Sequence, residues 1–324
     1  MGPDCPVRTN PSETTRASTG SSACVGAAAL RSLRGMTPFR RPPRDRPPRR
    51  QDSLVRNPRD LPKPGAEIRF DLNPDEEAAL LGALAPLVPP DVLPEAAKSF
   101  RDYLAGLVGW NIRSNLVAAG DRDRLVRRHV VESLACVPLL DELGGSTLID
   151  LGSGGGFPGV PIKLVRPQLE VALVESRRMK SLFLKRTIAS LRLGGIVAWQ
   201  VRAETLGGLP AGAAADASLA TGPGALSSPG AFASPDDPRV RPVVDLVTSR
   251  AVAAMEKTTR WVAPLVRPGG CLVTFKGSRV DEELVAWKAN PGPWELIRLE
   301  REVLPGLTLV ALRRLDFEEP DLPS

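Results

Sequence analysis

The sequence predicts an α/β protein in which a group of helices precedes a mainly parallel, seven-stranded sheet. Short apolar runs alternate with segments of helical spacing from residue 147 onward, as expected for βαβ units. The first run, 147–151, leads directly into the glycine-crowded turn 152–156. The last two runs are separated only by Leu304-Pro305-Gly306, which predicts an antiparallel hairpin at one end of the sheet.

Residues 1–64 differ in composition from the rest of the chain. They carry 13 Lys and Arg against 5 Asp and Glu and contain 11 prolines, whereas residues 65–324 carry 30 basic and 32 acidic residues. We expect a disordered, basic, Pro/Arg-rich extension, because this composition buries too little apolar area to offset chain entropy. Two interpretations stay open for it, a dispensable extension and a non-specific RNA attachment. Met36 lies just upstream of an arginine cluster, and one hypothesis is that the chain starts there.

Cysteine spacing and hydropathy indicate the kind of environment in which the protein works. The four cysteines show no CxxC pair, so neither a zinc site nor a disulfide framework is expected; they are Cys5, Cys24, Cys136 and Cys271. No window approaches the roughly 18 consecutive apolar residues of a membrane span. We expect a cytoplasmic protein that works without a metal and without a membrane.

Residues 65–140 are predicted to form a helical cap before the sheet. The segment Asn73–Val88 has a capping asparagine, acids in its first turn and an apolar stripe behind them. Two more helices are expected at Pro94–Val108 and Asp121–Leu140, with a polar turn at 110–116 between them.

Residues 141–324 are predicted to form the sheet domain. Seven strands are expected at about 147–151, 170–175, 196–202, 243–248, 270–276, 295–303 and 307–314. Helical crossovers between the first five make those strands parallel. This is the outline of class I methyltransferases, although a dehydrogenase shares most of it. A Gly/Ala/Ser/Pro-rich stretch at 207–242 interrupts the pattern and is expected to be a low-complexity insertion.

The turn after the first strand predicts a nucleotide-like cofactor. Gly152, Gly154 and Gly156 let the main chain approach a ligand or adopt dihedrals that a Cβ forbids. A dinucleotide fingerprint would require a third glycine at position 157, where Phe157 stands. This favours a methionine-bearing adenosine, which carries no phosphate, over NAD.

Two further strand ends are predicted to complete the pocket. Glu175 follows the second strand, where a carboxylate accepts ribose hydroxyls in a parallel sheet. The alternative for Glu175 is a solvated acid facing Arg177 or Arg178. Ala203 and Glu204 follow the third strand and are expected beside the adenine.

A set of motifs in fixed order makes the chain similar to the RsmG (GidB) family. The motifs are Asn115-Leu116, Arg128-His129-Val130-Val131-Glu132-Ser133-Leu134, Ile149 to Pro161, Glu175-Ser176, Lys180, Phe183-Leu184, Arg202-Ala203-Glu204, Ser249-Arg250-Ala251-Val252-Ala253 and Lys276-Gly277. The resemblance covers about residues 72–316. It implies a class I, S-adenosylmethionine-dependent enzyme that methylates N7 of one guanine in 16S ribosomal RNA. The extension 1–64 and the insertion 207–242 depart from the family pattern.

The resemblance also implies roles for single residues. Gly152, Phe157, Ala203, Glu204 and Arg250 match positions that contact the cofactor, and Arg250 lies beside it. His129 and Asn115 would present the guanine, with Arg250 and His129 as the catalytic candidates. Without the resemblance, a lone histidine on a helix is equally well a structural hydrogen-bonder. Basic residues that would contact RNA phosphates are Arg128, Arg178, Lys180, Lys185, Arg186 and Lys276.

The residue pattern agrees with N7 chemistry, because guanine N7 has a lone pair and no proton to lose. Thr248-Ser249-Arg250 stands where enzymes that methylate exocyclic amines usually carry an Asn/Asp-Pro-Pro-aromatic motif. We expect a monomer acting on an assembled or partly assembled small ribosomal subunit. The alternatives are an RNA-binding or nucleotide-sensing protein without turnover, and an NAD-dependent oxidoreductase.

Overall fold

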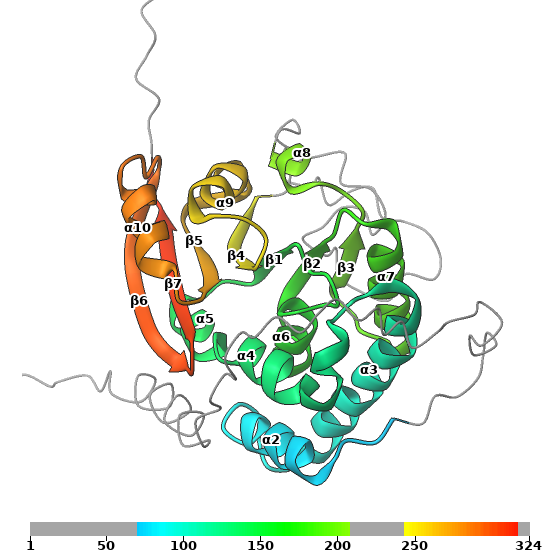
Figure 1. The fold of residues 1–324 in the computed structure, drawn as a ribbon. Helices are drawn as coiled ribbons and strands as arrows, with labels where there is room; N and C mark the ends of the chain where they lie inside the picture. The colour runs from blue at the N-terminus through cyan, green and yellow to red at the C-terminus, as the bar shows by residue number, and fades with distance from the viewer. Residues whose placement is uncertain (1–69, 208–242, 317–324) are drawn as a thin grey trace, which may run out of the picture.

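The computed structural model describes residues 70–207 and 243–316. The predicted extension at 1–64 and nearly all of the predicted insertion at 207–242 lie outside these residues. Seven strands form one sheet (Figure 1). They are β1 (Thr147–Leu151), β2 (Glu170–Val174), β3 (Ile196–Trp199), β4 (Val244–Arg250), β5 (Val266–Lys276), β6 (Trp294–Leu304) and β7 (Leu307–Arg314). The seven predicted strands are confirmed, with shifts of a few residues at their ends.

The strand order identifies the type of fold. The order is β3-β2-β1-β4-β5-β7-β6; the first five strands pair in parallel, and β7 runs antiparallel to both neighbours. This is the class I methyltransferase sheet that the sequence predicts. The order reverses at β1, between β2 and β4, which is where ligands bind at the carboxyl edge of open α/β sheets.

Two layers of helices cover the sheet, and alternation along the strands assigns each side chain to a layer. In β1, Leu148 belongs to the buried cluster on one face, while Ile149 and Leu151 belong to the cluster on the other. The first face is covered by α2 (Pro74–Leu84), α3 (Leu93–Ser114), α4 (Val131–Leu134), α5 (Val137–Leu143), α6 (Gly159–Val165) and α7 (Arg178–Ser190). The second is covered by α8 (Ala203–Gly207), α9 (Met255–Val262) and α10 (Val280–Lys288) (Figure 1).

The first two cap helices are present, with different ends. Asn73 caps α2, since its side chain accepts a hydrogen bond of 2.9 Å from the Glu76 N–H. Helix α3 continues to Ser114, so the prediction of a turn at 110–116 is wrong for most of that segment. The segment contains neither Gly nor Pro to stop the helix. The chain turns only at Asn115, whose φ of 45° is a left-handed conformation that asparagine tolerates.

The predicted helix at 121–140 is confirmed only in part, because the structure divides it into short helical pieces. These are a 3₁₀ segment at Ala119–Arg124, a π-helical turn at Val126–Val130, and helices α4 and α5. Glu76 contributes to one break, since its carboxylate accepts a hydrogen bond of 2.6 Å from the Val126 N–H. Pro138 contributes to another, because proline has no N–H and cannot donate a hydrogen bond to the carbonyl of Leu134.

The cap and the sheet share one core. A single buried cluster contains side chains of α2, α3 and α4 together with residues of β1, β2 and β4. Buried contacts therefore cross the boundary predicted at 140/141, and the division into a cap and a methyltransferase domain stays a prediction.

Candidate functional site

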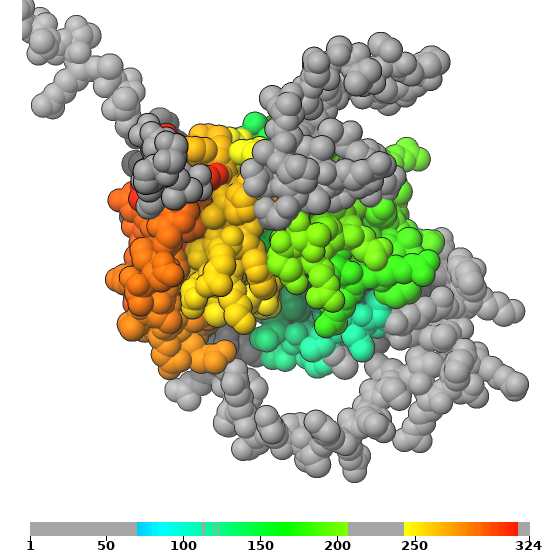
Figure 2. Space-filling model, turned by 90° about the horizontal axis from the view of Figure 1, so that it is seen from above, coloured from blue at the N-terminus to red at the C-terminus, as the bar shows by residue number. Residues whose placement is uncertain are grey.

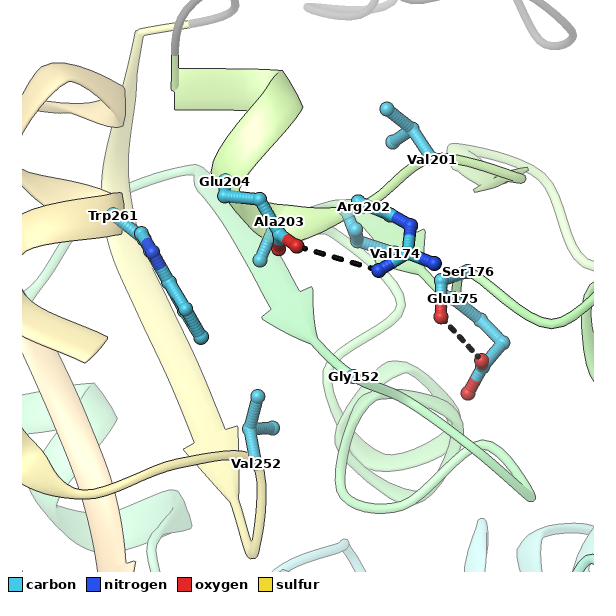
Figure 3. A pocket seen from close by; sticks show the side chains of 10 residues that line it. All are labelled: Gly152, Val174, Glu175, Ser176, Val201, Arg202, Ala203, Glu204, Val252 and Trp261. Carbon is cyan, nitrogen blue, oxygen red and sulfur yellow. Dashed lines mark hydrogen bonds and ion pairs between the residues drawn. The ribbon is translucent and has the colours of Figure 1, made fainter. Parts of the chain in front are cut away.

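A pocket of about 140 Å³ opens at the carboxyl ends of β1, β2 and β3. From above, the yellow and gold surface that follows β4 and the green surface up to residue 207 flank a hollow, with the teal surface of the N-terminal helices beyond it (Figure 2). Side chains from five segments line the pocket (Figure 3). The lining residues are Gly152, Val174, Glu175, Ser176, Val201, Arg202, Ala203, Glu204, Val252 and Trp261. The structure thus brings four predicted cofactor residues together: Gly152, Glu175, Ala203 and Glu204.

Gly152 begins the turn after β1 and must be glycine because of a protein neighbour. Its φ is +72°, and a Cβ built there would lie 2.5 Å from Cγ2 of Val252. Its N–H donates a hydrogen bond of 2.8 Å to the carbonyl of Val174 in β2. The missing side chain therefore lets the turn pass close to the segment after β4, which forms one wall of the pocket.

Gly156 and Gly159 serve the packing of the turn against the cap and the sheet. A Cβ at Gly156 would lie 2.9 Å from the hydroxyl of Tyr103, and the φ there is +97°. A Cβ at Gly159 would lie 2.4 Å from Leu173 Cδ2. Gly159 thus permits the close helix–sheet contact that the third glycine permits in dinucleotide-binding turns. Gly156 does not line the pocket.

Glu175 is held rigidly at the end of β2. Its Oε2 accepts a hydrogen bond of 3.1 Å from the N–H of Gly154, and its Oε1 accepts one of 2.7 Å from the N–H of Arg177. Its side chain is buried, although it lines the pocket. The structure does not support the alternative of a solvated acid that faces an arginine side chain. Glu175 is buried, and it contacts Arg177 through the backbone N–H of that residue.

The far side of the pocket combines a polar and an aromatic wall. Arg202 and Glu204 form an ion pair of 3.6 Å at the start of α8. Trp261 of α9 lies across the pocket from Ala203 and Glu204 (Figure 3). This arrangement leaves space between an indole and a short backbone segment at the end of β3.

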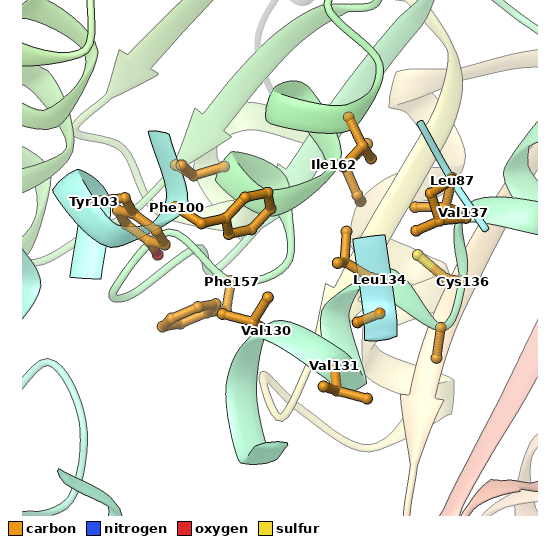
Figure 4. Close-up of a cluster of buried hydrophobic side chains, with 14 of the residues drawn as sticks. Leu87, Phe100, Tyr103, Val130, Val131, Leu134, Cys136, Val137, Phe157 and Ile162 are labelled. Atoms are coloured by element: carbon orange, nitrogen blue, oxygen red, sulfur yellow. The ribbon is translucent and has the colours of Figure 1, made fainter. Parts of the chain in front are cut away.

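Phe157 lies against the cap and is absent from the pocket lining. Its ring stacks on His129, with centroids 5.1 Å apart and planes at 26°, and tilts against Tyr103 at 5.5 Å. It belongs to the buried cluster that joins the turn to α3 and α4 (Figure 4). The Tyr103 hydroxyl donates a hydrogen bond of 2.5 Å to the carbonyl of Gly155, which fixes the turn to the cap.

Arg250, at the end of β4, binds the cap and does not line the pocket. Its guanidinium donates hydrogen bonds to Glu132 Oε2 at 2.8 Å and to the Arg128 carbonyl at 3.0 Å. The same nitrogen lies 3.2 Å from Nδ1 of His129. The structure therefore brings the two catalytic candidates, Arg250 and His129, into direct contact with each other.

The environment of His129 keeps its imidazole neutral. Burial and the neighbouring Arg250 guanidinium lower the pKa of His129 to about 4, although Asp121 acts in the opposite direction. Nε2 lies 3.3 Å from Oδ2 of Asp121. The ring thus accepts at Nδ1 from Arg250 and carries its proton on Nε2.

The residues predicted to contact substrate are dispersed. Asn115 is exposed at the end of α3, and Arg128 pairs with Asp121 at 3.0 Å. Arg178 is exposed at the start of α7. Lys180 is near the glycine turn, since its Nζ lies 4.0 Å from the Cβ position of Gly154.

The structure does not place Lys276 where it could contact an RNA phosphate, although the sequence predicts that contact. Its side chain is buried, and Nζ binds Glu283 at 2.7 Å. A second contact of 3.4 Å joins Nζ to the carbonyl of Ala253. Lys276 therefore ties the end of β5 to α10 and to the segment after β4, and is not exposed to a phosphate.

Six lining residues were not among the predicted cofactor contacts: Val174, Ser176, Val201, Arg202, Val252 and Trp261. A signal for Trp261 exists in the sequence. The buried positions of α9 include Met255, Thr258 and Val262, which form a stripe along one side of the helix. Trp261 lies outside this stripe. A large aromatic beside the buried stripe of a helix indicates a second contact surface.

Two further tests concern metals and membranes. Over residues 70–207 and 243–316, no group of three or more His, Cys, Asp or Glu is arranged to hold a metal ion. None of the described helices combines the length and the apolar character needed to cross a bilayer.

Comparisons with known proteins agree with the predicted family. A family model described as rRNA small subunit methyltransferase G (GidB) matches residues 96–217 and 235–295. A ribosomal RNA small subunit methyltransferase G of Sorangium cellulosum is 36% identical over 261 residues, which cover 76% of this chain and 97% of that protein. The protein of the same name from Roseiflexus castenholzii is 34% identical over 218 residues, covering 66% and 80%.

Among solved structures, a putative O-methyltransferase from Klebsiella pneumoniae is 11% identical, with a TM-score of 0.44, and the match covers 74% of this chain and 97% of that one. A likeness of this size carries no argument about function.

Proposed function

The chain belongs to the rRNA small subunit methyltransferase G family, and we propose that it transfers a methyl group from S-adenosylmethionine to N7 of one guanine in 16S ribosomal RNA. The observation that carries the proposal is the pocket at the carboxyl edge of β1, β2 and β3. Its lining combines the glycine turn, an acid after β2 and the segment after β3. In parallel α/β sheets, these are the positions that bind an adenosine-bearing cofactor.

Glu175 fits the ribose of that cofactor. An ionised carboxylate offers about four lone-pair sites. Two of the Glu175 sites receive the N–H groups of Gly154 and Arg177, and a third receives a long hydrogen bond of 3.5 Å from the Ser176 hydroxyl. One ribose hydroxyl can bind the free site on Oε2, and a second can replace the long contact to Ser176. A pre-oriented acceptor binds more tightly because little conformational freedom is lost on binding.

Trp261 and Ala203 fit the adenine. Both residues line the pocket, on opposite sides of it (Figure 3). We assign the indole to one face of the purine and the backbone at Ala203 to its edge. Stacking of a base on an aromatic side chain is worth about 1–3 kcal/mol. This assigns the nucleoside end of the cofactor to the β2–β3 side and its methionine end to the Gly152 turn.

When bound, the cofactor supplies an electrophilic methyl group on a sulfonium. Guanine N7 has no proton to remove, so the residues of this chain need to orient the base and exclude water. The neutral His129 agrees with that requirement, since its pKa of about 4 makes it a poor proton acceptor at neutral pH. Arg250 and His129 are proposed as positioning residues that fix the cap beside the site through Glu132 and the Arg128 carbonyl.

The test of this function is a mapped methyl transfer. Small ribosomal subunits from a strain lacking the protein are incubated with the wild-type chain and methyl-tritiated cofactor, and the 16S RNA is then cleaved by borohydride and aniline at N7-methylguanosine. One strong cleavage site carrying the label is expected. Incorporation without that cleavage would contradict the N7 assignment, and cofactor binding without incorporation would favour a nucleotide-sensing protein. We also propose a cytoplasmic location and an assembled subunit as substrate; equal methylation of naked 16S transcript would contradict the latter.

A variant pair isolates the role of Glu175. Glu175→Gln removes a charged acceptor and should weaken binding of adenosylhomocysteine about ten- to a hundred-fold, because hydrogen bonds to charged groups contribute about 1.5–3 kcal/mol. Glu170→Gln is the matched control, since Glu170 begins the same strand at the opposite edge of the sheet. Titration calorimetry measures both. Equal affinities of the two variants would remove Glu175 from the site.

A further inference from the structure

One segment of the folded part of the chain has an extreme charge balance. Residues 176–195 contain six Lys and Arg and no Asp or Glu, whereas the other residues of 65–324 contain 24 basic and 32 acidic residues. This segment includes the whole of α7. A cationic surface on an otherwise acidic body is a local electrostatic feature that attracts polyanions.

The exposed face of α7 combines these charges with apolar side chains. Arg178, Leu182 and Arg186 follow one another at intervals of four residues, which places them on one side of the helix. Met179 is 46% exposed and Leu182 is 47% exposed. The opposite side of α7 is buried in the protein through residues that include Phe183 and Leu184. Two large apolar side chains are thus held in solvent between arginines.

A groove of about 80 Å³ between α3 and α7 extends this face. Trp110 of α3 lies in it against Phe183, with ring centroids 6.1 Å apart. The guanidinium of Arg186 lies over the Trp110 ring, 5.9 Å from its centroid. Asp102 on the rim is paired with Lys98 at 2.9 Å. An arginine held over an aromatic ring presents a flat, charged surface, which suits nucleobases and phosphates.

The same face begins at the cofactor pocket. Ser176 lines the pocket, and α7 starts two residues later. Lys180 of α7 reaches the glycine turn, with its Nζ 4.0 Å from the Cβ position of Gly154. Helix α7 then runs beside α3 (Figure 1). A strand bound along α7 would therefore pass from the α3–α7 groove to the site of methyl transfer.

We propose that the exposed face of α7, with the α3–α7 groove at its far end, is the docking surface for a single-stranded segment of the substrate RNA. Arg178 and Arg186 bind phosphates, and Met179 and Leu182 contact bases or sugars. This inference rests on the proposed function and specifies where its RNA substrate lies. An acidic protein would match the charges, but the continuity with the transfer site and the arginine-covered indole favour a nucleic acid.

The experiment compares three variants with the wild-type chain. Arg178→Ala with Arg186→Ala removes two charges from the α7 face, and Met179→Ser with Leu182→Ser removes its apolar contacts. The matched control is Lys288→Ala with Arg301→Ala, which removes two charges from α10 and β6, near the opposite edge of the sheet. Binding of a fluorescent single-stranded RNA is measured from 50 to 300 mM salt, together with KM for small subunits and the affinity for adenosylhomocysteine.

The expected results differ between the variants. The double arginine variant should bind RNA at least about tenfold more weakly, with a salt slope reduced by about 1.4, because each single-strand phosphate contact contributes about 0.7 to the slope. The Met179/Leu182 variant should lose affinity with the slope unchanged, since it removes no charge. Adenosylhomocysteine binding should stay within about twofold in all three variants, and the control should match the wild type.

Each alternative outcome is distinguishable. If the wild type methylates small subunits and the α7 variants retain its KM and its RNA affinity, the docking surface is wrong while the function stands. Loss of subunit binding with naked RNA binding retained would indicate a ribosomal protein as the partner and overturn the inference. If the wild type itself transfers no methyl group, the proposed function has failed independently of α7.

Discussion

At the scale of single residues, Gly152 shows how a turn is fixed by its protein neighbours. Gly152→Ala should weaken adenosylhomocysteine binding strongly, because the new Cβ would lie 2.5 Å from Val252 and displace one pocket wall. Gly144→Ala is the matched control, since Gly144 has nearly the same φ of +71° with open space around it. Both variants carry backbone strain, since φ is positive at each position, and the ψ of −179° at Gly144 lies in a region that only glycine commonly adopts. Calorimetric titration should show a loss of affinity only at Gly152; equal affinities would mean that the collision with Val252 is unimportant.

His129 predicts a specific dependence of stability on pH. Its pKa in the folded chain is about 4, below the value of about 6.5 in an unfolded chain. The unfolded state therefore binds more protons between these values, so this contribution to stability is full above about pH 6.5 and is lost as the pH falls towards 4. Relative to His129→Asn, the unfolding free energy of the wild type should rise by up to about 3 kcal/mol from pH 4 to pH 7. Urea unfolding at several pH values measures it, and a parallel pH dependence of the two proteins would contradict the assignment.

The site residues fall into two groups: those whose position the local sequence specifies, and those whose position depends on tertiary packing. Gly152, Glu175 and Ala203 follow strand ends, and the carboxyl ends of parallel strands meet at one edge, so their assembly was predictable. Trp261 lines the pocket only because of the way α9 packs. Arg250 turns towards the cap because Glu132 and two backbone carbonyls offer it acceptors there. Side-chain direction of that kind depends on tertiary contacts that no local pattern contains.

At the scale of elements, strands were predicted better than cap helices. The strands β1, β2 and β3 are short apolar runs bounded by turn residues, so they are visible in the sequence. The segment 119–143 has helical periodicity but is divided into short pieces. The Glu76 carboxylate of α2 accepts a hydrogen bond from the Val126 N–H, and Pro138 has no N–H to continue the helical hydrogen bonds. A long-range hydrogen bond acceptor leaves no trace in the local pattern.

Asp245 provides a test of how the strands are joined. Burial raises the pKa of Asp245, but hydrogen bonds from Arg267, Ser146 and Thr147 outweigh it and hold this pKa below its usual range. These contacts connect β4 to the start of β1 and to β5. Asp245→Asn should lower the unfolding free energy by about 2 kcal/mol at neutral pH.

The sign of its pH dependence follows from the lowered pKa. The stabilisation by Asp245 is full above the unfolded value of about 3.9 and is lost as the pH falls through the folded value. The difference between wild type and Asp245→Asn in urea unfolding should thus be constant from pH 5 to 8 and shrink only in stronger acid. A difference that grows on acidification would contradict this role.

At the scale of the whole molecule, the continuous core predicts one cooperative unit. Side chains of α3 and β1 belong to the same buried cluster. Amide hydrogen exchange in rising urea should therefore show the protection of α3 and β1 converging on a single opening free energy. Peptides from β6, at the edge of the sheet, serve as the reference for local fraying. Loss of protection in α3 at a urea concentration that leaves β1 intact would instead support an independent cap.

The pocket lined by Gly152, Glu175 and Trp261 is proposed to hold the sulfonium nucleoside. A crystal structure of the chain with adenosylhomocysteine would show where this ligand binds. We predict the ribose hydroxyls within hydrogen-bond distance of Glu175, and the adenine with one face against Trp261 and its edge towards the backbone at Ala203. Density for the ligand at any other place, or a pocket that stays empty at saturating ligand, would contradict the account.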